Sequence, residues 1–172
     1  MVLGYLHCIG GVSGDMLLGA IVDAGIPVED LQAELAGFAV GGFSISACRS
    51  RRGGVDGTLV SVDIGNEPRQ FDTVGALIDM LEASDFTGSA ITRSREVLER
   101  LAQAEASVHG RQAEDVHLHE LGTVDTLVDV VGTVLGMEKL GIDRLFSSPL
   151  PTGSGIFQSA HGMLPAPSPA TA

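Results

Sequence analysis

The beginning of the chain joins a short apolar run to a helix-like run through a glycine-rich junction. Val2–Cys8 is apolar and ends at Gly10-Gly11, a pattern typical of a buried strand that runs into a turn. Apolar residues then recur at helical spacing over residues 16–24, with Ser13 as the expected N-cap. This strand-to-helix unit requires the fold to combine strands with helices.

The rest of the chain alternates between strand and helix periods. A second helix is predicted over Val28–Leu35, and alternating residues on both sides of Gly53-Gly54 predict a β-hairpin. Because a hairpin contains antiparallel neighbours, the fold class is α+β (or α/β), with a mixed sheet flanked by helices. The remaining predictions are helices over Val74–Leu81, Ala90–Val108 and Thr126–Leu140, a strand over Ile142–Ser148, and a buried side of the long helix made of Ile91, Val97, Leu98, Leu101, Ala104 and Val108.

Length and composition predict one main domain with an aliphatic core. The 172 residues are 44% hydrophobic but include only 6 Phe, 1 Tyr and no Trp. Residues 1–148 are expected to form an α/β domain. Residues 149–172 hold five of the 7 prolines and are expected to form a Gly/Pro-rich loop or linker.

The charge is strongly acidic, at -12 from 22 acids and 10 bases. Such a surplus repels phosphate backbones, which excludes nucleic acid as the main partner. No run is long and apolar enough to span a bilayer, and two cysteines are too few for a disulfide framework. We therefore expect a cytoplasmic protein with free thiols and no membrane contact.

The densest group of metal-ligating side chains lies between His117 and Asp129. In an extended segment, His117 and His119 point to the same side, and Glu120 follows them directly. Asp125 and Asp129 are four residues apart on the predicted helix and share one face. Imidazoles with carboxylates suit a divalent ion such as Zn, Ni, Co, Fe or Mn. The alternative is two ordinary histidines on an exposed strand beside a solvated acidic helix face.

The glycine-rich junction itself is a second candidate site. Gly11, Ser13 and Gly14 lie at a predicted helix start, where free N–H groups attract anions. Asp15 would oppose a bare phosphate unless a divalent ion bridged the two. The alternative is a tight strand-to-helix turn capped by Ser13.

Two further segments carry residue types that commonly bind ligands in proteins. Arg52 belongs to the only dense basic cluster, with Arg49 and Arg51, and arginine suits phosphate or carboxylate groups. Gly153, Ser154 and Gly155 follow the last predicted strand and suggest a binding loop, with a flexible linker as the alternative.

Four motifs in the same order resemble the N-terminal region of LarC-type nickel insertion proteins. They are CIGGVSGD with MLLGA, the hairpin residues RGG and GT, AEASVHG with HLHELGTVDTLVDVVG, and SPLPTGSG with AHGMLPAP. The resemblance implies a nickel chelatase, a lyase that places Ni(II) into pyridinium-3,5-bisthiocarboxylic acid mononucleotide. The product is the nickel-pincer nucleotide cofactor of lactate racemase and related enzymes.

The resemblance also implies cofactors, partners and residue roles. CTP with Mg or Mn is expected, bound by a C-terminal domain that also forms the homo-oligomer, and the apo-racemase is an expected partner. Nickel would be delivered by His117, His119 and Glu120, with Asp125 or Asp129 behind them, and His119, Glu120 and Asp15 are the expected catalytic residues. Gly11, Ser13, Gly14, Arg52, Gly153, Ser154 and Gly155 would hold the nucleotide. Two alternatives stay open: a metal- or nucleotide-binding module without activity of its own, and a metal-dependent phosphohydrolase.

Overall fold

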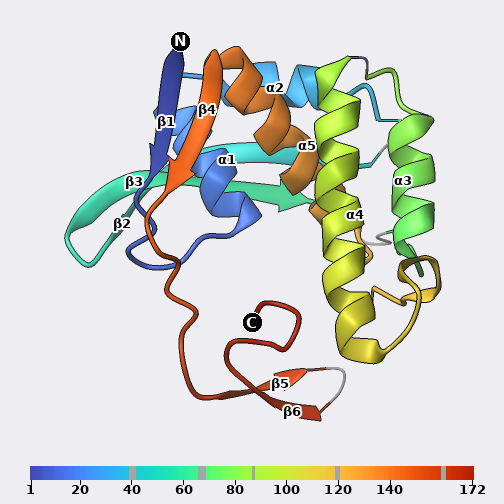
Figure 1. Cartoon of the computed structure of the whole chain (residues 1–172). Coiled ribbons are helices and arrows are strands. Elements are labelled where there is room, and N and C mark those ends of the chain that lie inside the picture. The colour runs from blue at the N-terminus through green and yellow to red at the C-terminus, as the bar shows by residue number, and fades with distance from the viewer. Residues whose placement is uncertain (39–41, 66–68, 87, 119–120, 160–161) are drawn as a thin grey trace.

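The computed structural model describes residues 1–38, 42–65, 69–86, 88–118, 121–159 and 162–172. Helices and strands are mixed along this chain, as predicted (Figure 1). The strands are β1 (Val2–Leu6), β2 (Ser44–Arg52), β3 (Val55–Asp63), β4 (Ile142–Ser147), β5 (Ile156–Ser159) and β6 (Gly162–Pro165). The helices are α1 (Gly14–Asp23), α2 (Val28–Leu35), α3 (Val74–Glu82), α4 (Ser89–His109) and α5 (Val124–Lys139), with a short 3-10 turn over Ala113–Asp115.

The fold class is confirmed as α+β, but in the described part of the chain the strands form three separate two-stranded sheets. β1 pairs with β4 in parallel, whereas β2 pairs with β3 and β5 pairs with β6 in antiparallel hairpins. Parallel and antiparallel pairs therefore occur in different sheets and not in one mixed sheet. The stretch predicted as a loop or linker, 149–172, contains the β5–β6 hairpin.

Local chemistry explains three of the helix ends. Thr73 and Thr123 precede α3 and α5, and each hydroxyl oxygen accepts a hydrogen bond from the backbone N–H three residues later, at 3.3 Å. Helix α4 ends at Gly110, whose φ of 61° suits glycine far better than other residues. Within the described ranges, no helix is both long and apolar enough to cross a membrane.

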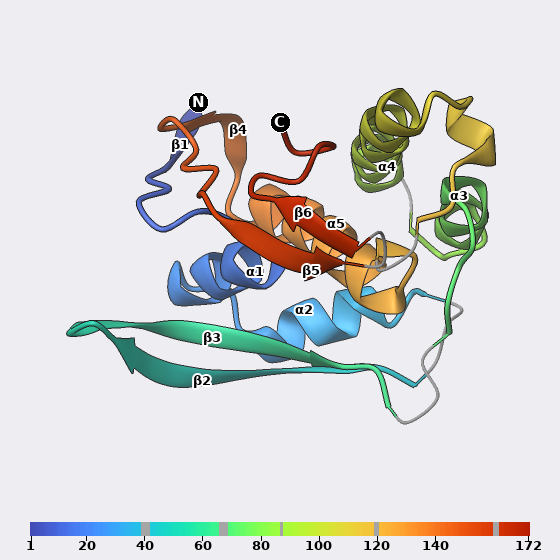
Figure 2. The ribbon, with the colours of Figure 1, turned by 90° about the horizontal axis from the view of Figure 1, so that it is seen from below.

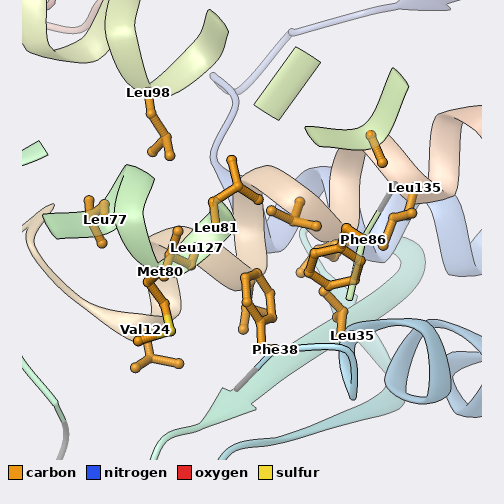
Figure 3. Close-up of a cluster of buried hydrophobic side chains, with 14 of the residues drawn as sticks. Leu35, Phe38, Leu77, Met80, Leu81, Phe86, Leu98, Val124, Leu127 and Leu135 are labelled. Carbon is orange, nitrogen blue, oxygen red and sulfur yellow. The ribbon is translucent and has the colours of Figure 1, made fainter. Parts of the chain in front are cut away.

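The core lies among the helices and one face of the β2–β3 hairpin. Figure 2 shows the hairpin beneath α1 and α2, with α5 beyond them and α3 and α4 to one side. Aliphatic side chains fill the centre, and the few aromatic rings pack edge to face, as Phe38 and Phe86 do at 4.8 Å between ring centroids. Figure 3 shows this cluster, which includes Leu35, Leu77, Met80, Leu81, Leu98, Val124, Leu127 and Leu135.

Two predicted patterns of burial are wrong. Val97 and Val108 are exposed, because α4 buries a narrower stripe of mostly small residues: Ala90, Ser94, Leu98, Ala102 and Ala106. The first strand is predicted to be buried, but β1 contributes no residue to the core, since among the described strands it pairs only with the equally exposed β4.

Glycines allow α1 to pack closely against its neighbours. A Cβ atom on Gly19 would lie 2.4 Å from the backbone oxygen of Thr58 in β3. Cβ atoms on Gly132 and Gly136 of α5 would lie 2.9 and 2.6 Å from the side chains of Leu18 and Ile21, respectively. Helix α1 is therefore held against the hairpin on one side and against α5 on another, at distances that larger residues forbid.

We expect Gly19→Ala to destabilise the protein by about 1–3 kcal/mol, because the added methyl group meets backbone that cannot rotate away. Gly75→Ala in α3 is the matched control, since its Cβ would make only an ordinary contact at 3.6 Å. That change should be neutral or stabilise by up to about 1 kcal/mol. Urea unfolding followed by circular dichroism measures both; equal stability of Gly19→Ala and the wild type would contradict the close contact.

Candidate functional site

Gly14, in the first turn of α1, lies against the side chain of Asp129 in α5. A Cβ atom on Gly14 would lie 2.1 Å from the carboxylate oxygen Oδ2 of Asp129. The Asp129 carboxylate therefore lies directly against the backbone of α1. Asp15 is in the same first turn, and Asp125 is one turn before Asp129 on α5.

The structure thus brings three predicted carboxylates together. Burial, as the largest cause, and the negative charges of Asp125 and Asp15 together raise the pKa of Asp129 to about 7. The pKa of Asp125 is also raised, first by burial and then by Asp15. The Oδ1 atom of Asp129 is buried and has no hydrogen-bond partner. An unsatisfied buried carboxylate oxygen beside two other acids favours a bound cation.

The three carboxylates determine which charge the glycine-rich junction at Gly11–Asp15 can bind. The Ser13 side chain does not cap α1; its hydroxyl donates to Asp15 Oδ1. Two further acids from α5 stand beside the same turn. A bare phosphate would be repelled here despite the free N–H groups of the helix start, whereas a divalent ion, alone or carrying a phosphate, would be attracted.

His117 lies at a different place, on an extended segment between the 3-10 turn and α5. It is exposed, while Val116 and Leu118 on either side are buried, which confirms the expected alternation over these three residues. A β-bridge joins His117 to Thr73, just before α3. The Leu118 N–H donates a hydrogen bond to the backbone carbonyl oxygen of Asp72 at 3.1 Å. The predicted ligands His119 and Glu120 lie outside the described residues.

Within the part of the chain that the structure describes, no three His, Cys, Asp or Glu side chains are arranged to hold a metal ion together. Asp125 and Asp15 are near enough to Asp129 to raise its pKa, but the three carboxylates do not form a finished ligand set. The metal ligands His117, His119, Glu120, Asp125 and Asp129 therefore stay a prediction.

The other predicted nucleotide-binding residues, Arg52 and the loop of Gly153, Ser154 and Gly155, lie away from the start of α1 in the sequence. Arg52 ends β2 and lines a 270 Å³ pocket with Met16 and residues 55–59 of β3. Gly153 and Gly155 have φ values of 74° and 112° in the exposed segment before β5. No described contact joins Arg52 or the Gly153, Ser154 and Gly155 loop to the aspartates.

The sequence analysis did not anticipate a pocket between the end of α4 and the β5–β6 hairpin. It encloses 330 Å³ and has mostly apolar walls, including Leu118, Phe157 and Leu164. Glu105 and His109 line it from α4, with Glu105 Oε2 3.6 Å from His109 Nε2. The i,i+4 spacing of this acid and histidine is a sequence signal that could have found the pair.

Comparison with known proteins now settles the family. The model of the family described as nickel insertion protein matches residues 4–172. The chain belongs to the nickel insertion protein family. A putative nickel insertion protein of Citrifermentans bemidjiense is 40% identical over 172 residues, which are 100% of this chain and 45% of the relative.

Some relatives in this family carry a more specific name, pyridinium-3,5-bisthiocarboxylic acid mononucleotide nickel insertion protein. The one from Desulfitobacterium hafniense strain DCB-2 is 40% identical over 99% of this chain and 42% of its own length. The one from Staphylococcus saprophyticus is 37% identical over 98% of this chain and 43% of its own length. The chain thus spans less than half of each relative, and no solved structure matches it.

The stability of the protein should fall as the pH rises from 5 to 8. The folded state raises the pKa of Asp129 to about 7, so between its ordinary pKa of about 4 and pH 7 the folded protein binds more protons than the unfolded chain. Charging Asp129 then destabilises the folded state, by on the order of 1–4 kcal/mol.

Asp129→Asn should flatten this dependence, because the amide does not titrate. Asp79→Asn, on the exposed face of α3, serves as the control and should keep the wild-type slope. The free energy of urea unfolding at pH 5, 6, 7 and 8 measures both. An unchanged slope in Asp129→Asn would show that another group carries the dependence.

Proposed function

We propose that the chain is the N-terminal part of a cytoplasmic nickel chelatase, a lyase that inserts Ni(II) into pyridinium-3,5-bisthiocarboxylic acid mononucleotide. The observation that carries the proposal is the buried, unpartnered Oδ1 of Asp129, held against Gly14 beside Asp15 and Asp125. Family membership supplies the metal and the substrate class.

The ligand chemistry suits a protein that carries nickel and then releases it. Imidazole nitrogen and carboxylate oxygen bind Ni(II), yet the metal can leave them for the sulfur atoms of the substrate. In the proposal His117, His119 and Glu120 deliver the ion. Asp125 or Asp129 is the proposed outer partner that orients these ligands and attracts the cation.

The acids also provide for the proton that the reaction releases. When nickel bonds to a ring carbon, it replaces hydrogen, so one proton must leave that carbon for each C–Ni bond formed. Glu120 and Asp15 are the proposed acceptors, with His119 as the alternative base. A positioned carboxylate can accept such a proton as a general base.

The finer features of the activity come from the resemblance. The proposal includes CTP with Mg or Mn, a homo-oligomer, and lactate racemase-type enzymes as recipients of the cofactor. Gly11, Ser13, Gly14 and Arg52 are the proposed contacts to the nucleotide end, together with Gly153, Ser154 and Gly155. The carboxylates beside Gly14 suit a divalent ion that bridges the protein to a phosphate there.

Calorimetric titration of Ni(II) tests the metal assignment directly. The double variant His117→Ala, His119→Ala should bind Ni(II) at least about tenfold more weakly, since two imidazole ligands are lost. His7→Ala is the matched control, because His7 is an exposed histidine at the end of β1 and should be dispensable. Equal affinities in the double variant and the wild type would eliminate these ligands.

A second candidate function is a binding module that lacks activity alone. The observation that favours it is the coverage, since the chain matches only 42–45% of the relatives' lengths. A nickel-insertion assay with the thiocarboxylate precursor and CTP, run on this chain with and without the remaining part of a relative, separates the two, because no turnover in either mixture would favour the binding module. We expect turnover when the remaining part of a relative is supplied, and at least about tenfold less from this chain alone. Turnover that does not require CTP would contradict the proposed cofactor.

A further inference from the structure

The parallel sheet β1–β4 lacks the cover that such sheets normally have. Parallel sheets occur almost only with both faces buried, and an isolated pair of strands is marginally stable in water. Here Leu3 is 56% exposed, Tyr5 65% and Phe146 45%. Neither strand contributes a residue to the buried core. The apolar composition of this sheet is therefore unexplained by the contacts within the chain.

A groove runs beside the free edge of β4. The other edge pairs with β1, and among the described strands none pairs with the edge that faces α4. The groove encloses 660 Å³. Its apolar lining comes from three elements: Ile142 and Leu145 of β4, Val134 and Met137 of α5, and Val97 of α4.

The shape and lining of the groove match the inner face of one more strand. A strand added to the free edge of β4 would satisfy its unpaired backbone groups, and every second side chain would point into the groove. Val97 and Leu145, each 47% exposed, stand on opposite walls and would be covered. Charged residues of both signs, among them Arg93, Glu96 and Asp143, line the same groove and fit polar side chains at its margins.

We propose that this groove receives an apolar β-strand from the part of the family's longer polypeptide that lies outside the matched stretch. The relatives have more than half of their residues there, because the matched part is 42–45% of their length. A second copy of this chain is the less suitable occupant, since each copy carries a net charge of -12 and the two would repel. The assignment depends on family membership and not on the nickel chemistry.

Photo-crosslinking in a full-length chimera tests the proposal. The 172 residues of this chain replace the matched stretch of the Citrifermentans bemidjiense relative, with p-benzoylphenylalanine at position 97 or 145. Both positions should crosslink to the same short segment of the relative's remaining part. Position 55 is the control, because Val55 is 74% exposed at the hairpin turn, and it should not reach that segment.

Isotope mixing identifies the occupant. Crosslinks within one polypeptide support the proposal. Crosslinks between labelled and unlabelled copies, or only within the 172 residues, overturn it. Nickel plays no part in the readout, so the result is independent of the metal assignment.

Hydrogen exchange gives a second measurement that also works on the intact 172-residue chain. Backbone amides of β4 should exchange at least about tenfold more slowly in the chimera than in the chain alone. In light scattering the chain alone should be monomeric. A dimer of the chain that Leu145→Asp dissociates would show that a second copy occupies the groove, and would overturn the proposal. Equal exchange rates of the β4 amides in the chain and the chimera would also overturn it.

Discussion

The close approach of α1 to α5 is the contact on which the rest of the molecule depends. Gly132 and Gly136 leave room for Leu18 and Ile21, and Gly14 leaves room for a carboxylate. The first two contacts build the core, and the third sets the electrostatics of the candidate site. Because packing and charge placement come from one helix pair, the energetic cost of burying Asp129 is met by aliphatic contacts along the same two helices.

Membership of the nickel insertion protein family and the local physics agree on a cation and not on a bare anion at α1. A glycine-rich turn before a helix usually favours phosphate. Three acids change that preference here, since Asp15, Asp125 and Asp129 outweigh the partial positive charge of one helix end. The site therefore suits a metal that can approach with or without an anionic group attached.

Local patterns in the sequence predicted most elements, and distant contacts account for what they missed. Helix α2 has the predicted bounds, Val28–Leu35, because Pro27 and an apolar period define it locally. The exposure of β1 could not be predicted, since its partner β4 lies about 140 residues away and apolar strands look alike whether covered or not. At the site, helical spacing predicted that Asp125 and Asp129 share one face of a helix. The approach of Asp129 to Gly14 could not be predicted, because it depends on the packing of two helices that are far apart in the sequence.

The end of helix α1 is fixed to the β2–β3 hairpin by side-chain hydrogen bonds. Asp23, at the end of α1, accepts hydrogen bonds from Thr58 at 2.7 Å and from Arg49, and these bonds hold the pKa of its carboxyl below the ordinary range. Gly14 and Asp15 stand at the other end of the same helix, about 12–13 Å away along its axis. Asp15 is on α1, whereas Asp125 and Asp129 are on α5. A tilt of the β2–β3 hairpin that α1 followed would therefore move Asp15 relative to the other two carboxylates.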